Sequence, residues 1–99
     1  MARVSLKVTH ADNEIVVFLN GLVVYAREQE EDVSFDDVTD LDPYLTSGLN
    51  ILILVGVNWS AAANYQGALT IGDITQPFSY QKDDAQPGVS WIQTFTIPA

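Results

Sequence analysis

The stretch VVFLNGLVVY, residues 16–25, holds two apolar runs on either side of Asn20-Gly21. Asn-Gly favours a type I′ turn, because both residues tolerate the positive φ angles that this turn requires. The pattern therefore predicts a β-hairpin made of residues 14–19 and 22–26. Neither run alternates with polar residues, so both faces of the hairpin need a cover.

Strand patterns continue along the rest of the chain. Residues 3–9 alternate apolar and polar side chains, as in a half-buried strand, and residues 89–97 place Trp91 in phase with core positions. Residues 51–57 are apolar throughout and too short for a helix, which favours a strand buried on both sides. Weaker patterns predict strands at 33–38, 68–74 and 78–82, turns at 10–13 and 82–88, a loop at 58–67, and a helical turn at 43–46 capped by Asp42. Seven or eight short strands predict an all-β fold, an antiparallel β-sandwich that forms a single domain of residues 1–99.

The charge balance limits the classes of partner. The 99 residues carry four basic and thirteen acidic side chains, a formal net charge of −9. Phosphate recognition depends on cationic side chains that release counterions, so we expect no nucleic-acid partner and no membrane surface as partner. No export signal is recognised at the start of the sequence, and cysteine is absent. We therefore expect a soluble cytoplasmic protein, with leaderless release as an alternative.

The doubly apolar strands raise the question of what covers their outer sides. A two-sheet sandwich buries one face of each sheet, and residues 15–19, 22–26 and 51–57 are apolar on both. The cover could be the acidic segment 28–42, a ligand, or another copy of the chain. The acidic segment holds eight of the thirteen acids and few apolar residues, which makes it a poor lid. We therefore expect a homo-oligomer, a dimer or higher.

The sequence offers little to catalysis. His10 is the only histidine, and its place near a predicted turn indicates a surface residue rather than the centre of a triad. Adjacent acids such as Asp83-Asp84 lie in polar runs, where a carboxyl keeps its charge. Calcium could be bound by the acids at positions 36, 37, 40 and 42, but the spacing and turn glycine of a helix-loop-helix calcium site are missing. We expect no enzyme, no cofactor and no metal.

One loop carries a pattern typical of a ligand site. Trp59 and Tyr65 offer flat apolar rings, while Asn58 and Asn64 offer paired donors and acceptors. Such a mixture can stack on a sugar ring and hydrogen-bond its hydroxyls. The alternative is structural, because a tryptophan at a strand exit can also plug the end of a sandwich. The predicted carbohydrate contacts are Asn58, Trp59, Asn64 and Tyr65.

Three segments carry a resemblance to a known family. The segments VVFLNGLVV (16–24), FDDVTDLDPYLTSGLNILILV (35–55) and NWSAAANYQGALTIGDI (58–74) resemble the galactose-binding-like jelly roll found in β-galactosidase-type glycosidases and carbohydrate-binding modules. The matching positions are scaffold, so the resemblance implies this fold and, as a class expectation, carbohydrate binding. Alanines stand at 61–63 where related enzymes carry an acidic residue, so no active-site role is implied.

The sequence therefore predicts a lectin-like, non-catalytic module that forms a homo-oligomer and binds carbohydrate. Repeated sites in an oligomer would raise the effective affinity for a repeated ligand. The alternative is a protein-protein assembly module without a sugar ligand, which docks through its apolar hairpin. A carboxylate-based hydrolase is a third and weaker hypothesis.

Overall fold

The structure, a computed structural model, describes residues 3–60 and 62–99. These residues form seven antiparallel strands and one short 3-10 helix, which confirms the predicted all-β fold. In chain order the elements are β1 (Val4–Leu19), β2 (Leu22–Gln29), β3 (Asp37–Asp40), η1 (Asp42–Tyr44), β4 (Leu49–Asn58), β5 (Ala63–Ile71), β6 (Ile74–Lys82) and β7 (Gly88–Pro98).

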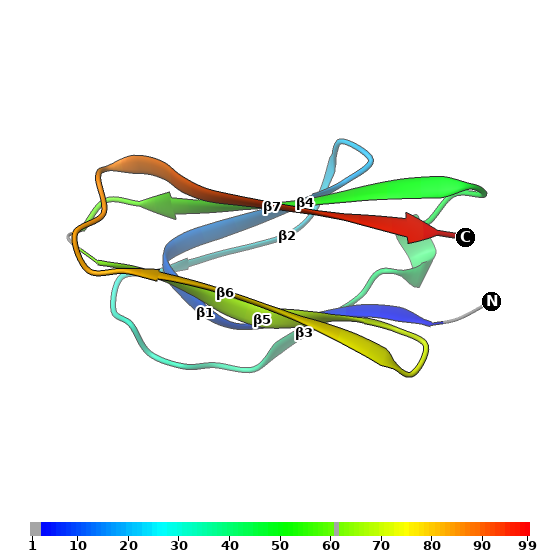
Figure 1. The fold of residues 1–99 in the computed structure, drawn as a ribbon, viewed down its shortest axis with the longest axis horizontal. Coiled ribbons are helices and arrows are strands. Elements are labelled where there is room, and N and C mark those ends of the chain that lie inside the picture. The colour runs from blue at the N-terminus through cyan, green and yellow to red at the C-terminus, as the bar shows by residue number, and fades with distance from the viewer. Residues whose placement is uncertain (1–2, 61) are drawn as a thin grey trace.

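The long strand β1 belongs to both layers of the molecule. Its first half pairs with β3 and β5, and its second half pairs with β2 and β4. The partners change between Ala11, which lies opposite Tyr65 of β5, and Glu14, which lies opposite Val57 of β4. Figure 1 shows β1 running along one layer, bending, and returning in the other. The seven strands thus form one curled sheet with two facing layers.

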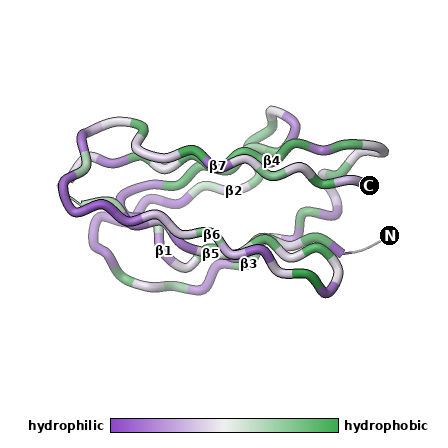
Figure 2. The backbone as a smooth tube through the Cα atoms, in the orientation of Figure 1, coloured by the Kyte–Doolittle hydropathy of each residue, from purple (hydrophilic) through white to green (hydrophobic). Residues whose placement is uncertain are grey.

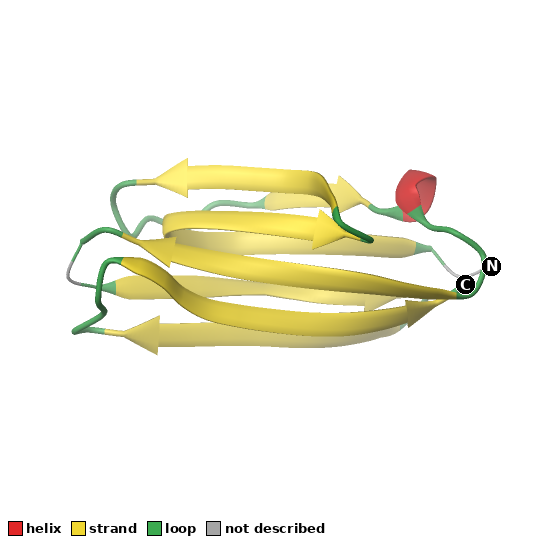
Figure 3. Cartoon of the chain, turned by 90° about the horizontal axis from the view of Figure 1, so that it is seen from above, coloured by secondary structure: helices red, strands yellow, loops and turns green. Residues whose placement is uncertain are grey.

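The strand order places β6 and β7 at the two ends of this curled sheet. The path of paired strands runs β6-β5-β1-β4-β7, and β2 and β3 pair along the other edge of β1. Because the sheet curls, β6 and β7 face each other across its open side without pairing. Aromatic rings close this side: the Phe78 and Trp91 centroids lie 5.6 Å apart, and the Tyr80 and Trp91 centroids lie 6.4 Å apart. Figure 3 shows the strands running lengthwise, with most of the connections at the two ends of the molecule.

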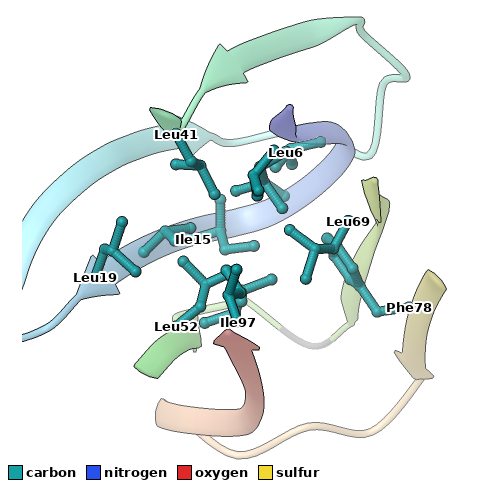
Figure 4. Packing of buried hydrophobic residues seen from close by; sticks show 13 residues of the cluster. Leu6, Ile15, Leu19, Leu41, Leu52, Leu69, Phe78 and Ile97 are labelled. Atoms are coloured by element: carbon teal, nitrogen blue, oxygen red, sulfur yellow. The ribbon is translucent and has the colours of Figure 1, made fainter. Parts of the chain in front are cut away.

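The core lies between the two layers. Leu6 and Leu69 project from the β1, β5 layer toward Ile15, Leu52 and Ile97 of the other layer, and all five side chains are buried. Figure 4 shows these side chains meeting in one cluster. Alternation along each strand sends every second side chain inward, so the apolar residues between them face outward. The strand β4 follows this rule, with a buried residue at every second position.

The structure differs from the predicted elements at five places. The predicted strand at 33–38 is shifted, because only Asp37–Asp40 pair with β1, and the predicted strand at 68–74 ends at Ile71, where a two-residue turn leads into β6. The predicted turn at 10–13 is the bend within β1, which stays hydrogen-bonded because Ala11 and Asp12 pair with β5. Part of the predicted loop 58–67 is β-strand, since β5 begins at Ala63. Asp42 does not cap the helical turn, because the N-cap residue is Leu41. The Asp42 Oδ1 atom instead accepts a hydrogen bond of 2.7 Å from the Val4 N–H.

Gly56 provides the space that the aromatic cluster needs. The Tyr65 ring is fully buried and lies so close to β4 that a Cβ atom at Gly56 would be 2.5 Å from its Cε2 atom. Tyr65 cannot move away freely, because its ring stacks on Trp91 at 5.5 Å and on Tyr80 at 6.2 Å. The absence of a side chain at Gly56 is therefore a packing requirement.

We expect Gly56→Ala to lower the free energy of unfolding by about 1–3 kcal/mol, because the added methyl group overpacks the core against Tyr65. Urea denaturation measures this change. In a Tyr65→Leu background the same substitution should cost clearly less, since the clashing ring is gone. Equal costs in the two backgrounds would contradict the packing argument.

Candidate functional site

The predicted ligand loop lies at the end of the molecule where β1 bends between the layers. We call this region the crossing end and define it by Asp12, Asn13, Asp32, Trp59 and Asn64. Figure 2 shows hydrophilic residues gathered at this end, in contrast to the apolar strands. The crossing end thus combines a solvent-facing loop with polar groups from β1 and β5.

Asn13 ties two connections to the bend of β1. Its Oδ1 atom accepts hydrogen bonds from the Trp59 N–H at 2.8 Å, the Ser60 N–H at 3.0 Å and the Ser60 hydroxyl at 3.1 Å. Its Nδ2 atom donates to the Glu30 carbonyl at 3.4 Å. The Asn13 side chain is buried, so these bonds are shielded from competing water. One amide therefore fixes the backbone of two connections. The first, between β4 and β5, we call the Trp59 connection, and the second, residues 30–36 between β2 and β3, we call the acidic connection.

Trp59 is the exposed member of the predicted sugar contacts. Its relative exposure is 46%, so much of the side chain is open to solvent rather than buried as a plug. Its backbone is held by Asn13. The indole is therefore presented on a fixed support, and a preorganised aromatic group loses less entropy when it binds a ligand.

The other three predicted contacts lie at the same end, but their side chains serve the fold. Tyr65 is buried, and its hydroxyl lies 2.9 Å from the Ser90 Oγ atom; burial raises the pKa of this phenol. Asn58 is buried and donates to the Ala85 carbonyl at 3.2 Å. Asn64 is buried too, and its amide donates to Asp32. In this structure only Trp59 of the four is widely open to a ligand.

Asp12 and Asp32 form an acidic pair that the sequence analysis did not identify. Asp12 lies opposite Asn64 in the pairing of β1 with β5. The Asn64 Nδ2 atom donates to both carboxylate oxygens of Asp32, at 2.8 and 3.0 Å. Burial, and then the neighbouring Asp32 carboxylate, raise the pKa of Asp12. The two acids are far apart in sequence, and both are placed beside Asn64, Asp12 by strand pairing and Asp32 by its hydrogen bonds.

The four acids considered for calcium binding are engaged elsewhere. Asp37 accepts hydrogen bonds from the Tyr25 hydroxyl and from Arg27, and chiefly the tyrosine bond holds the pKa of this carboxyl below its usual range. Asp36 lies 2.9 Å from the Lys7 ammonium group. The remaining two, Asp40 and Asp42, lie within 3.9 Å of Arg3. Within residues 3–60 and 62–99 no group of three acidic, histidine or cysteine side chains is arranged to hold a metal.

A shallow groove lies on the outer side of the layer that contains β5 and β6. It has a volume of about 330 Å³ and is lined by polar groups of Lys7, Thr9, Gln66 and Ser79 over the apolar surface of Pro77. Gln66 connects the groove to the crossing end, because its Nε2 atom donates to the Asn64 Oδ1 atom at 2.8 Å. Trp59 does not line this groove.

We expect Asn13→Ala to speed hydrogen exchange at the Trp59 and Ser60 amides, because both lose their buried acceptor. The unsatisfied donors should also lower the free energy of unfolding by about 1–3 kcal/mol. Exchange followed by NMR measures the first effect, with the amides in the centre of β4 as an internal control. Unchanged protection at Trp59 and Ser60 would contradict the anchoring role of Asn13.

Comparison with models of protein families, with curated proteins and with solved structures gave no match for this chain. The part of the chain that the structure describes has no helix with the length and apolar character of a membrane span.

Proposed function

We propose that this chain is a non-catalytic assembly module that pairs with a second copy of itself. The proposed contact is the outer face of the layer formed by β2, β1, β4 and β7, which we call the apolar face. The observation that supports it is the continuous row of apolar side chains across four neighbouring strands. In sequence order these side chains are Val16, Phe18, Val23, Ala26, Ile51, Ile53, Val55, Val57, Val89 and Ile92.

Strand register brings these residues into rows. Val16 lies opposite Ala26 on one side and Val55 on the other, and Val55 lies opposite Ile92. Residues that lie directly opposite in antiparallel strands project from the same face and contact each other. This row therefore crosses all four strands without a polar interruption, whereas the next row, which runs through Phe18 and Ile53, ends at Thr94 of β7.

Nothing within the described residues covers this face. The acidic connection was one candidate cover, but it runs along the edge of β1 in the other layer, where the Phe35 N–H donates to the Thr9 carbonyl at 2.9 Å. Val89 and Ile92 both have a relative exposure of 61%. Large contiguous apolar patches on soluble proteins mark interaction surfaces.

The size of the face suits a dimer. Strands lie about 4.8 Å apart and residues on one face repeat every ~6.8 Å, so four strands over four rows cover roughly 500 Å². This area includes the polar positions at the ends of the rows, such as Glu14, Glu28 and Thr94. Two such faces would bury roughly 1000 Å² together, which meets the lower limit for a specific protein interface. A second copy is the simplest occupant, because a two-fold axis makes one flat apolar surface complementary to itself.

The placement of charge on the face is compatible with this pairing. Glu14 and Glu28 lie opposite each other at one end of the apolar face, beside Val57. A two-fold axis near the centre of the face would place these acids over the opposite end of the partner. The like charges of the two copies would then be well separated, which limits their repulsion.

We expect Val89→Glu and Ile92→Glu to weaken dimerisation by tenfold or more, a change of about 1.4 kcal/mol or above, because each places a charge in a desolvated contact. Sedimentation velocity over a micromolar concentration series measures the dimer fraction.

Val38→Glu is the matched control. Val38 has a relative exposure of 65% and lies on β3 in the other layer, so this variant adds the same charge away from the apolar face. We expect it to dimerise as the wild type does. A wild-type chain that stays monomeric throughout the series would overturn the proposal, and equal loss in all three variants would indicate a general charge effect instead.

Carbohydrate binding at Trp59 is a second candidate function, supported by the exposed indole on its fixed connection. The resemblance to the galactose-binding-like jelly roll supports the same hypothesis, since the curled all-β sheet is compatible with that sandwich. An aromatic face stacks on the apolar side of a sugar ring. A dimer would present two such sites, which raises the effective affinity for a repeated glycan.

We expect a glycan array to give a specific signal with the wild type that Trp59→Ala abolishes. Tyr44→Ala removes another exposed aromatic side chain, which lies in η1 away from the crossing end, and it should leave the signal unchanged. A blank wild-type array together with a stable dimer would favour the assembly function alone.

A further inference from the structure

We propose that the crossing end contains a binding site for a divalent cation of the calcium type, formed by the carboxylates of Asp12 and Asp32. This site is distinct from the acidic positions 36, 37, 40 and 42, and it does not depend on the apolar face or on carbohydrate binding.

A buried carboxylate without a hydrogen-bond donor is the central observation. Asp12 has a relative exposure of only 5%, and its Oδ1 atom is buried with no hydrogen-bond partner in the described part of the chain. Leaving a charged oxygen without solvent or a donor is costly, so such groups are normally paired or bound to a metal. The described residues therefore supply no donor to the Asp12 Oδ1 atom, and a bound cation would fill this role.

Strand pairing directs Asp12 toward a second carboxylate. Asp12 and Asn64 are directly opposite in β1 and β5, so their side chains share one face of the layer. Asn64 holds both oxygens of Asp32 at 2.8 and 3.0 Å, which fixes the Asp32 carboxylate over the same position. The Asn13 amide holds the Glu30 carbonyl and so draws the connection before Asp32 against β1.

Within residues 3–60 and 62–99, no basic side chain forms an ion pair with Asp12 or Asp32. Among the described residues, the ion pairs of Arg3, Lys7 and Arg27 are all made with other acids, and Lys82 makes none. The net charge of −9 adds an attraction for cations from solution.

The ligand chemistry favours calcium. Carboxylate and amide oxygens are hard ligands, and calcium accepts six to eight of them in an irregular geometry. Asp32 is exposed, so the coordination positions that the two carboxylates leave open can be taken by water. Soft metals are not favoured, because the sequence has no cysteine and its one histidine, His10, has its Nδ1 atom 3.0 Å from the Thr9 hydroxyl.

Binding would also stabilise the support of Trp59. A cation between Asp12 and Asp32 would hold the acidic connection to β1 and β5, and Asn13 links that connection to the Trp59 backbone. We therefore expect calcium to slow hydrogen exchange at the Trp59 and Ser60 amides. This effect serves as a second readout that is independent of the binding heat.

The test is calorimetric titration of the chelator-treated full chain with calcium chloride, together with thermal melting with and without calcium. We expect one calcium ion per chain and a higher melting temperature in calcium, because a ligand that binds only the folded state stabilises it. Asp32→Asn, at an exposed position, and Asp12→Asn should each weaken binding by about tenfold or more. Without calcium, Asp12→Asn should melt above the wild type, since it removes the buried charge.

Asp73→Asn is the matched control, because Asp73 is an exposed acid in the turn between β5 and β6 and the variant loses the same charge. It should bind calcium as the wild type does. Absence of binding heat and of a melting shift in the wild type would overturn the proposal. Equal weakening in Asp73→Asn and Asp32→Asn would also overturn it, because calcium would then bind to the overall charge rather than to this pair.

Discussion

Both layers of the molecule are hydrogen-bonded to one strand, β1, and the rest of the architecture depends on this constraint. The strand pairs with β3 and β5 before its bend and with β2 and β4 after it. Its inward side chains, such as Leu6 and Ile15, therefore enter the same core from opposite layers. Only β6 and β7 lack a direct bond to β1, and they meet through aromatic rings.

The bend of β1 requires polar groups to be buried where the layers diverge. Asn13 is almost completely satisfied, and it organises both nearby connections. The Oδ1 atom of its neighbour Asp12 has no hydrogen-bond partner among the residues that the structure describes. The two adjacent residues thus have different roles. Asn13 supports the local structure, and Asp12 carries a buried negative charge that a bound cation would neutralise.

Local signals in the sequence predicted what depends on local structure. The Asn-Gly turn was predicted correctly, because Asn20 and Gly21 both adopt positive φ angles that few other residues tolerate. The strand at 51–57 was also predicted correctly and extends to Leu49–Asn58 by pairing with β7, but within the chain only one of its two faces is buried. The residues at 10–13 were predicted as a turn because their polarity favours solvent, whereas in the structure strand pairing carries them through the bend.

The candidate sites were less predictable, because each depends on contacts between distant segments. Nothing near Asn64 or Tyr65 in the sequence indicates that they belong to a strand whose neighbours bury them. The placement of Asp12 and Asp32 beside the same residue, Asn64, likewise follows from the register of β1 with β5 and from a hydrogen bond to a distant connection, which no local pattern contains. Trp59 was identified from its residue type, and its exposure depends on where the strand β4 ends.

The position of the chain ends has a practical consequence. Arg3 and Ala99 lie at the end of the molecule opposite the Trp59 connection (Figure 1), and Ala99 is held there by two backbone hydrogen bonds of 2.8 Å to Gly48. A tether attached at either point would orient the domain with its tryptophan directed away from the support. Immobilisation on a sensor chip, or fusion to a reporter protein, would therefore leave the end that carries Trp59 accessible.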